Sequence, residues 1–148
     1  MTSVDSAKLD AATYNAFVAD LDLAGIDLIK IHGERTSAGT PSQIRFDLAA
    51  SYMPDGTAIN YRYEVEAHIL DEHDKALGNV AITIQVTVRT TAEADKACIE
   101  QFGGTSGALM AHPYLREAVA SAGQRIGFPG LLLPMIKQQP ANSEDSQR

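Results

Sequence analysis

Three successive segments in the middle of the chain alternate apolar and polar residues with a period of two. Apolar side chains occupy every second position in residues 43–52, 59–69 and 80–88. Because successive side chains of a strand point to opposite faces of a sheet, each segment predicts a strand with one apolar face. The turn Pro54-Asp55-Gly56 and a polar stretch at 71–78 separate them. The pattern predicts an antiparallel meander with one dry and one wet face.

The segments before this meander predict one helix and one further strand. Residues 6–21 carry a rough 3.6-residue apolar stripe, and Asp5 or Ser6 can cap the start of the helix. Residues 26–32 are apolar on both sides, which is expected of a strand that is covered on both faces. A polar loop rich in turn-forming residues follows at 32–42.

After the meander, the pattern becomes helical. Residues 92–102 predict a short helix, and the run Gly103-Gly104-Thr105-Ser106-Gly107 predicts its end. A second helix is expected to start at His112-Pro113, because proline is favoured in a first helical turn, and to end before Gly127. An apolar segment at 130–136 follows it.

This order of elements predicts a single α+β domain. We assign it residues 1–137, of which 1–21 are an N-terminal helical extension. Residues 138–148 are polar and contain Pro140, so we expect them to form a disordered tail. The helices are expected to cover the dry face of the sheet, since an apolar face must be buried against another element.

Composition excludes several classes of protein. The 148 residues are 45% hydrophobic and 21% charged, and the formal net charge is −7. This charge argues against nucleic-acid binding, which needs a basic patch. No apolar run approaches the roughly 20 residues that span a bilayer, and residues 1–10 lack the apolar region of a secretory signal. The single cysteine, Cys98, fits a reducing compartment. We therefore expect a soluble cytoplasmic protein.

A family resemblance comes from the C-terminal half. The stretch His112-Pro113-Tyr114-Leu115-Arg116-Glu117, followed by Ile126-Gly127-Phe128-Pro129 and then by an apolar Leu/Pro segment at 131–134, resembles the signature of SecB-type export chaperones. The strand Ile44-Arg45-Phe46-Asp47-Leu48 is similar to the second strand of that family. The resemblance extends over roughly residues 22–136 and includes the order of the elements.

The resemblance implies a four-stranded antiparallel sheet backed by a helix, assembled as a dimer of dimers, that holds unfolded client proteins in apolar grooves without nucleotide or cofactor. Its groove-lining strand corresponds to Ile44, Phe46 and Leu48, and we add the neighbours Leu132, Leu133, Met135 and Ile136. All seven could instead be core. For the helix, core or a subunit interface is the expected role of Tyr114, Leu115, Val119, Ala122 and Ile126.

The sequence departs from that family in three places. The long C-terminal helix of the family is absent or shortened here, because Pro140 and a polar tail follow closely, so the N-terminal segment could replace it as a groove wall. The positions that correspond to the SecA-docking acids of the family fall near Gly25 and Ile29, and the tail has no motif for a partner's zinc module. Coupling to the export motor SecA is therefore doubtful, and a SecB-like chaperone that controls an antitoxin is the alternative.

No set of residues indicates an enzyme. His68 and His73 flank two acids in an arrangement that a transition metal would accept, but a solvated turn is the simpler interpretation. A lone Cys98 on an apolar helix face is usually buried and inert. We therefore predict no catalytic residue, metal or cofactor. Two other functions stay open: a small-molecule binder built on the apolar face, or an adaptor whose apolar surface is consumed by its own oligomer.

Overall fold

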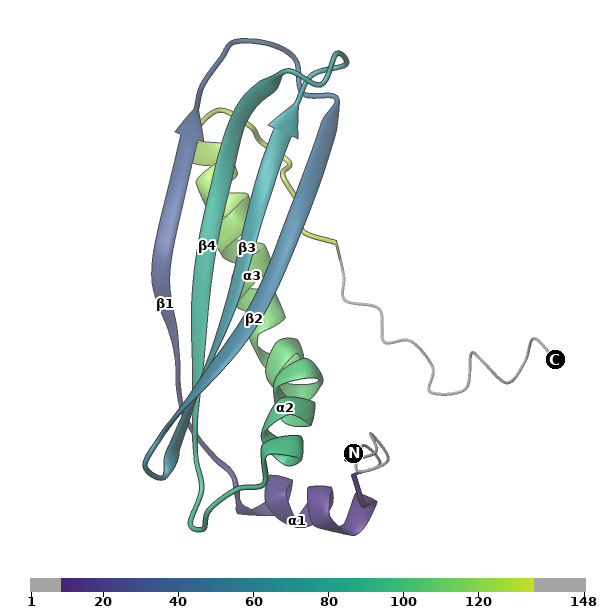
Figure 1. The fold of residues 1–148 in the computed structure, drawn as a ribbon. Helices are drawn as coiled ribbons and strands as arrows, with labels where there is room; N and C mark the ends of the chain where they lie inside the picture. Colours follow the sequence, from purple (N-terminus) through teal and green to yellow (C-terminus); the bar gives the residue numbers. More distant parts are fainter. Residues whose placement is uncertain (1–8, 135–148) are drawn as a thin grey trace, which may run out of the picture.

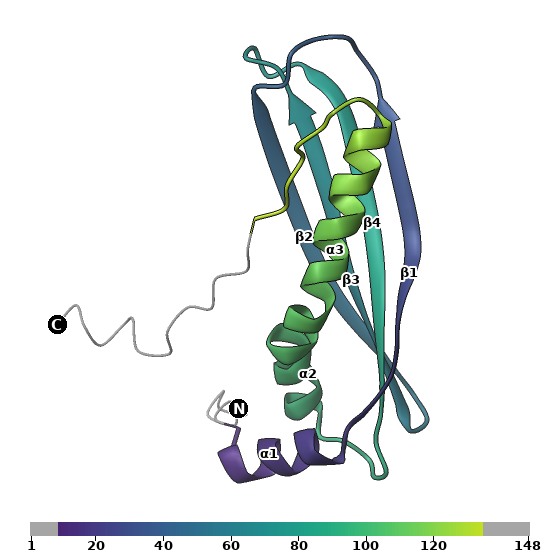
Figure 2. The ribbon, with the colours of Figure 1, turned by 180° about the vertical axis from the view of Figure 1, so that it is seen from behind.

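The computed structural model describes residues 9–134 and shows a sheet with helices along one face (Figure 1). The helices α2 and α3 follow one another along that face, and α1 lies across the end of α2 (Figure 2). The elements are α1 Ala11–Asp20, β1 Asp22–Arg35, β2 Gln43–Asp55, β3 Ala58–Leu70, β4 Ala76–Arg89, α2 Lys96–Gly104 and α3 Ser106–Arg125.

The four strands are antiparallel and lie in the order β1-β4-β3-β2. The predicted meander is thus confirmed for β2, β3 and β4, and β1 adds to it at the outer side of β4. The register aligns the apolar positions: Leu48 pairs with Val65, which pairs with Ile82. A one-residue slip would turn these side chains to the other face, so the alternation in the sequence fixes this register.

The hydrophobic core lies between α3 and the two central strands. Alternate residues of β3 and β4 are buried on this face, and α3 packs mainly on β4 with further contacts to β1 and β3. The predicted α+β class, with helices on one face of an antiparallel sheet, is confirmed. The largest fully buried side chains are Tyr61, Ile69, Leu77, Ile82, Val65, Val80, Val86, Val88, Val119 and Cys98.

Two buried tyrosines join the sheet to the junction of α2 and α3. The Tyr61 hydroxyl donates to the carbonyl of Ile99 at 2.8 Å, and the Tyr63 hydroxyl donates to that of Gly103 at 2.7 Å. A Cβ at Gly103 would lie 2.7 Å from the Tyr61 ring, and one at Gly107 would overlap the Tyr63 hydroxyl. The glycines therefore allow both helices to approach the tyrosines closely.

The C-terminal end of α3 is held by an arginine from β1. The Arg35 guanidinium donates to the carbonyls of Ile126 and Gly127 at 3.4 and 3.3 Å, and it lies 4.7 Å from the centre of the Phe128 ring. Carbonyls at a helix C-terminus lack intrahelical partners and carry partial negative charge, so a cation stabilises them. Gly127 takes φ +88°, the left-handed conformation that commonly ends a helix.

The beginning of α3 differs from the sequence expectation. The helix starts at Ser106, and only Thr105 separates it from α2, so the glycine-rich run is mostly helical. Pro113 lies inside the helix on its exposed face. It costs one intrahelical hydrogen bond there. The turn of helix that precedes the proline contains Gly107, which lies against the Tyr63 hydroxyl.

The first strand and the first helix also differ from expectation. β1 was predicted to be covered on both faces, which is wrong: nearly all its side chains are exposed, because it forms an edge of the sheet. The helix α1 starts at Ala11 with Asp10 as its N-cap, and it packs on α2. The predicted caps Asp5 and Ser6 lie outside the described residues. Of the described helices, none is long and apolar enough to cross a membrane.

Candidate functional site

The second strand carries an apolar surface that the helices leave open. Ile44, Phe46, Leu48 and Tyr52 lie on the helix-bearing face of the sheet, because they pair with residues of β3 whose side chains are buried there. One helix is about 10 Å wide and strands are about 4.8 Å apart, so a helix covers roughly two strands. α3 packs mainly on β4, with fewer contacts to β1 and β3, and α2 contacts β2, so most of this row of side chains lies beside α3 and not under it. We call these four residues the β2 strip.

Exposure within the β2 strip varies along the strand. Leu48 is 66% exposed and Ile44 is 40% exposed, whereas Phe46 and Tyr52 are half-buried and pack against the core. The three strand residues assigned to a groove from the sequence therefore do lie on one face, and two of them present much of their surface to solvent. An exposed apolar strip of this kind marks a binding surface more often than a single exposed side chain does.

At its Tyr52 end, the β2 strip meets the start of α2. The Tyr52 hydroxyl donates to a carboxylate oxygen of Glu100 at 3.1 Å, and its ring centre lies 6.1 Å from that of Tyr61. Burial of the hydroxyl, together with Glu100, raises the pKa of Tyr52, so it remains a neutral hydrogen-bond donor at physiological pH. Beside it is a cavity of about 700 Å³, lined by Tyr52, Pro54, Gly56, Thr57, Ile59, Thr90, Thr91, Ala92, Glu93, Ala94, Lys96 and Ile99.

The other residues predicted for the groove differ in their exposure to solvent. Leu132 is 54% exposed, whereas Leu133 is only 3% exposed and belongs to the core. Met135 and Ile136 lie outside the described residues. Only Leu132 among these neighbours thus offers described apolar surface beside α3.

Most of the helix residues named from the sequence lie on the side of α3 that faces the sheet. Leu115, Val119 and Ala122 are buried against the sheet, and Ile126 is half-buried at the end of the helix beside Gly33 of β1. Tyr114 is 49% exposed. Leu115, Val119 and Ala122 therefore belong to the core. Tyr114 is the exposed residue of this set that a second subunit could contact.

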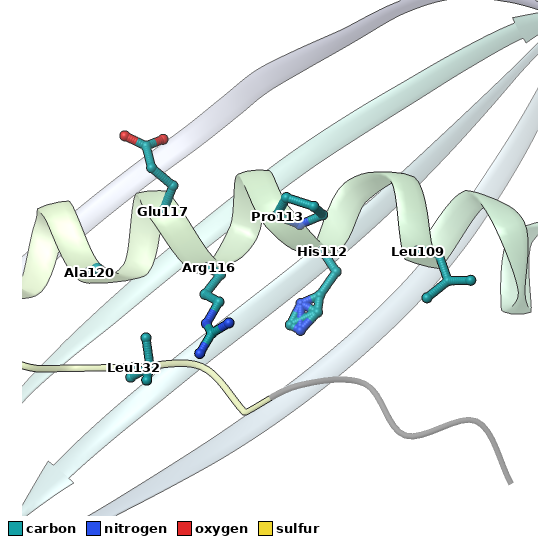
Figure 3. Close-up of a pocket in the computed structure, with 7 residues that line it drawn as sticks. All are labelled: Leu109, His112, Pro113, Arg116, Glu117, Ala120 and Leu132. Atoms are coloured by element: carbon teal, nitrogen blue, oxygen red, sulfur yellow. The ribbon is translucent and has the colours of Figure 1, made fainter.

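The outer face of α3 holds a second cavity, which sequence reasoning missed. The cavity is about 490 Å³ in volume and lies between the helix and the chain near Leu132, with His112 and Arg116 directed toward that chain and Glu117 directed away (Figure 3). The ring Nε2 of His112 lies 2.9 Å from the carbonyl oxygen of Pro134 and donates to it. The lining residues are Leu109, His112, Pro113, Arg116, Glu117, Ala120 and Leu132.

The electrostatics of this second cavity follow from its burial. The ring Nδ1 of His112 and the Nε of Arg116 are buried without a hydrogen-bond partner in the described part of the chain. Burial, and then the charge of Arg116, lower the pKa of His112, so the ring is neutral at physiological pH. The cavity is therefore lined by apolar side chains together with a neutral His112, the Arg116 cation and Glu117. No sequence signal indicated it, because it depends on the path of residues after the helix.

The face of the sheet opposite the helices is polar. The Nε2 of His68 lies 3.1 Å from an Asp47 carboxylate oxygen and 3.9 Å from one of Glu66, while His73 lies beside Glu72. Within residues 9–134, no group of three or more His, Cys, Asp or Glu side chains is arranged to hold a metal ion.

Cys98, the remaining reactive side chain considered from the sequence, is buried at 1% exposure. Burial raises the pKa of the Cys98 thiol. Since the thiolate is the nucleophilic form, the thiol is poorly suited to covalent chemistry.

Comparison with known proteins identifies the fold. No protein-family model and no curated protein matches the sequence. The structure is similar to that of the Mycobacterium tuberculosis SecB-like chaperone Rv1957 in complex with a ChAD peptide from the Rv1956 HigA1 antitoxin. The TM-score is 0.75 at 16% identity, over 86% of this chain and 99% of the other. A Streptococcus agalactiae protein of unknown function gives a TM-score of 0.48 at 9% identity, over 78% and 97% of the two chains. The chain therefore has a SecB-like fold.

Proposed function

We propose that this protein is an ATP-independent chaperone that holds unfolded client chains against the β2 strip. The observation that best supports this proposal is a row of apolar side chains at an edge of the sheet, in which Leu48 is 66% exposed. Burial of apolar surface contributes about 25 cal/mol per Å², so several modest contacts along an extended client add up to useful affinity. Such contacts need no particular client sequence.

The described side chains support holding and not catalysis. The hydroxyls of Tyr61 and Tyr63 are committed to main-chain carbonyls, and the thiol of Cys98 is buried. The proposal accordingly requires no cofactor. It places the protein in the cytoplasm, and it includes self-association to a dimer or a tetramer, for which exposed Tyr114 is one available contact.

Two client classes fit the proposal. The SecB-like structural neighbour was determined with a peptide of an antitoxin, which favours an antitoxin segment as a client here too. Clients destined for export are the other class. Export coupled to SecA has weaker support, because Arg62 and Arg45 interrupt the acidic residues on the polar face of the sheet.

The test is suppression of client aggregation. A slowly refolding client would be diluted from denaturant with and without this protein, in the absence of nucleotide, while light scattering is recorded. The mass of the protein would be fixed beforehand by gel filtration with multi-angle scattering. Suppression at near-stoichiometric amounts is the expected result. Unchanged scattering would refute the chaperone proposal and favour a small-molecule binder, for which the 700 Å³ cavity beside Tyr52 is the first place to search.

A further inference from the structure

Two side chains that line the cavity on the outer face of α3 have a polar atom without a partner. His112 is only 8% exposed, and its Nδ1 is buried without a hydrogen bond in residues 9–134. The Nε of Arg116 is also buried without a partner, and no described carboxylate forms an ion pair with this side chain. Such atoms are costly, because they give up hydrogen bonds to water and gain none. Two of them, one helical turn apart at the same cavity, point to a ligand that supplies the missing partners.

The hydrogen bond to the chain after α3 fixes the tautomer of His112. Its Nε2 lies 2.9 Å from the carbonyl oxygen of Pro134, and a carbonyl only accepts, so Nε2 carries the proton of the neutral ring. Nδ1 is then an acceptor, and it becomes a donor only when the ring is protonated. Burial, and then the charge of Arg116, lower the pKa of His112 and oppose that protonation. Arg116 is the one charged group among residues 9–134 that contributes to this shift.

An anion in the cavity would satisfy both side chains. The planar guanidinium of Arg116 pairs with a carboxylate through two parallel hydrogen bonds. The side chain is only partly buried, so a ligand can reach it from the cavity. A negative charge beside His112 favours the protonated ring. Its Nδ1–H then donates to the anion, while Nε2–H keeps its bond to Pro134.

The remainder of the lining selects an apolar body for the ligand. It consists mostly of the apolar side chains Leu109, Pro113, Ala120 and Leu132. The cavity volume of about 490 Å³ lies within the roughly 300–1,000 Å³ that is usual for small-molecule sites. The one acid of the lining, Glu117, is directed away from the chain that closes the cavity, whereas His112 and Arg116 are directed toward it (Figure 3). The site thus combines an apolar wall with a cationic end.

We propose that this cavity binds a short apolar carboxylic acid together with one proton, with the carboxylate held by Arg116 and protonated His112 and the alkyl chain held by Leu109 and Leu132. These two leucines are 44% and 54% exposed, so a bound alkyl chain covers apolar surface that is otherwise in contact with water. The proposal goes beyond the chaperone function and does not depend on it, because the cavity shares no lining residue with the β2 strip.

The test is isothermal titration calorimetry of the full chain with octanoate. Octanol and octylammonium, which have the same alkyl chain, are the comparison ligands. We expect octanoate to bind at least about tenfold more tightly than octanol, and octylammonium to bind most weakly, because Arg116 attracts an anion and repels a cation. Two buffers of different ionisation enthalpy reveal the proton uptake. One proton taken up per ligand makes the affinity fall by up to about tenfold between pH 7 and pH 8.

Four variants assign the site. Arg116→Gln should weaken octanoate binding about tenfold or more, and Arg116→Lys should weaken it less, because lysine keeps the charge but not the planar fork. His112→Gln should abolish the proton uptake, even where binding remains. Arg45→Gln removes an exposed cation on the other face of the sheet and is the matched control. It should bind octanoate as the parent does, and circular dichroism checks that each variant is folded.

Several outcomes would overturn the proposal. Equal affinities for octanoate and octanol, or unchanged octanoate binding in Arg116→Gln, would mean that the alkyl chain adheres to apolar surface without the cation. Equal losses in Arg116→Gln and Arg45→Gln would mean that only the overall charge matters. Binding without proton uptake would remove His112 from the site. Absence of octanoate binding also overturns the proposal, including the case in which residues 135–148 of the chain itself fill the cavity.

Discussion

Replacing Leu48 by aspartate should weaken client binding and leave the fold intact. Leu48 is 66% exposed in the middle of the β2 strip, so a bound client covers apolar area that the protein alone does not bury. Full burial of a leucine side chain contributes about 1.5–3 kcal/mol, and the exposed two-thirds therefore correspond to about 1–2 kcal/mol. The loss predicts an affinity about 5- to 30-fold lower. Covering the new carboxylate with an apolar client adds to this loss.

Met53 offers a matched control on the same strand. It is 69% exposed, slightly more than Leu48, but it pairs with Asn60 and so lies on the opposite face of the sheet. Met53→Asp introduces the same charge in the same strand at a similar exposure. Phe46→Asp is a less decisive variant, because Phe46 is half-buried against the core and its loss would also lower the free energy of unfolding.

The assay is a titration of a labelled unfolded client, read by fluorescence anisotropy, with urea unfolding of each variant measured in parallel. We expect Leu48→Asp alone to lose affinity, while both variants unfold at similar urea concentrations. Equal losses for the two variants would mean that the added charge acts regardless of the face. Unchanged affinity in Leu48→Asp would refute the assignment of the β2 strip.

Three further predictions concern stability. Arg35→Met should lower the free energy of unfolding by about 1–2 kcal/mol in urea titrations, because the last carbonyls of α3 lose their cationic donor. Gly107→Ala should lower the melting temperature by overlap with the Tyr63 hydroxyl, and the same substitution made together with Tyr63→Phe should cost less. Hydrogen bonds from Thr91 hold the pKa of Asp20 below its ordinary 3.8, so this carboxylate stabilises the fold above that pH and the contribution is lost as the pH falls further. Asp20→Asn should thus be less stable than the parent near neutrality, and the gap should close in acid unfolding curves below pH 3.8.

The central strands could be predicted from the sequence because each has one dry and one wet face. β3 and β4 are buried on one side at alternate positions, and this geometry produces the period-2 pattern directly. The place of β1 could not be predicted in this way. Its apolar residues occur on both sides because two bulges shift its register and because an edge strand has little cover. Local pattern alone does not distinguish that situation from burial on both faces.

The start of α3 was mispredicted for a related reason. Gly103 and Gly107 look like helix breakers in the sequence, but each is required by a tyrosine that is about 40 residues away in the chain. The groove strand was located from a family resemblance. Whether Phe46 and Leu48 would be core or accessible depended on which strands α3 covers, and that is a property of packing that no local pattern contains.

The structure distinguishes a sealed half of the sheet from an open half. β3 and β4 are closed by α3 and by the tyrosine bonds to the helix junction, so their apolar residues are not available to a client. Both edges remain apolar, with Leu28 and Ile31 of β1 about half-exposed. An edge interrupted by bulges can still pack side chains but is a poor template for main-chain pairing. If the protein self-associates, β1 can therefore contribute side-chain contacts to an interface. The β2 strip, beyond which no other strand of residues 9–134 lies, is then still available as the surface that we propose for clients.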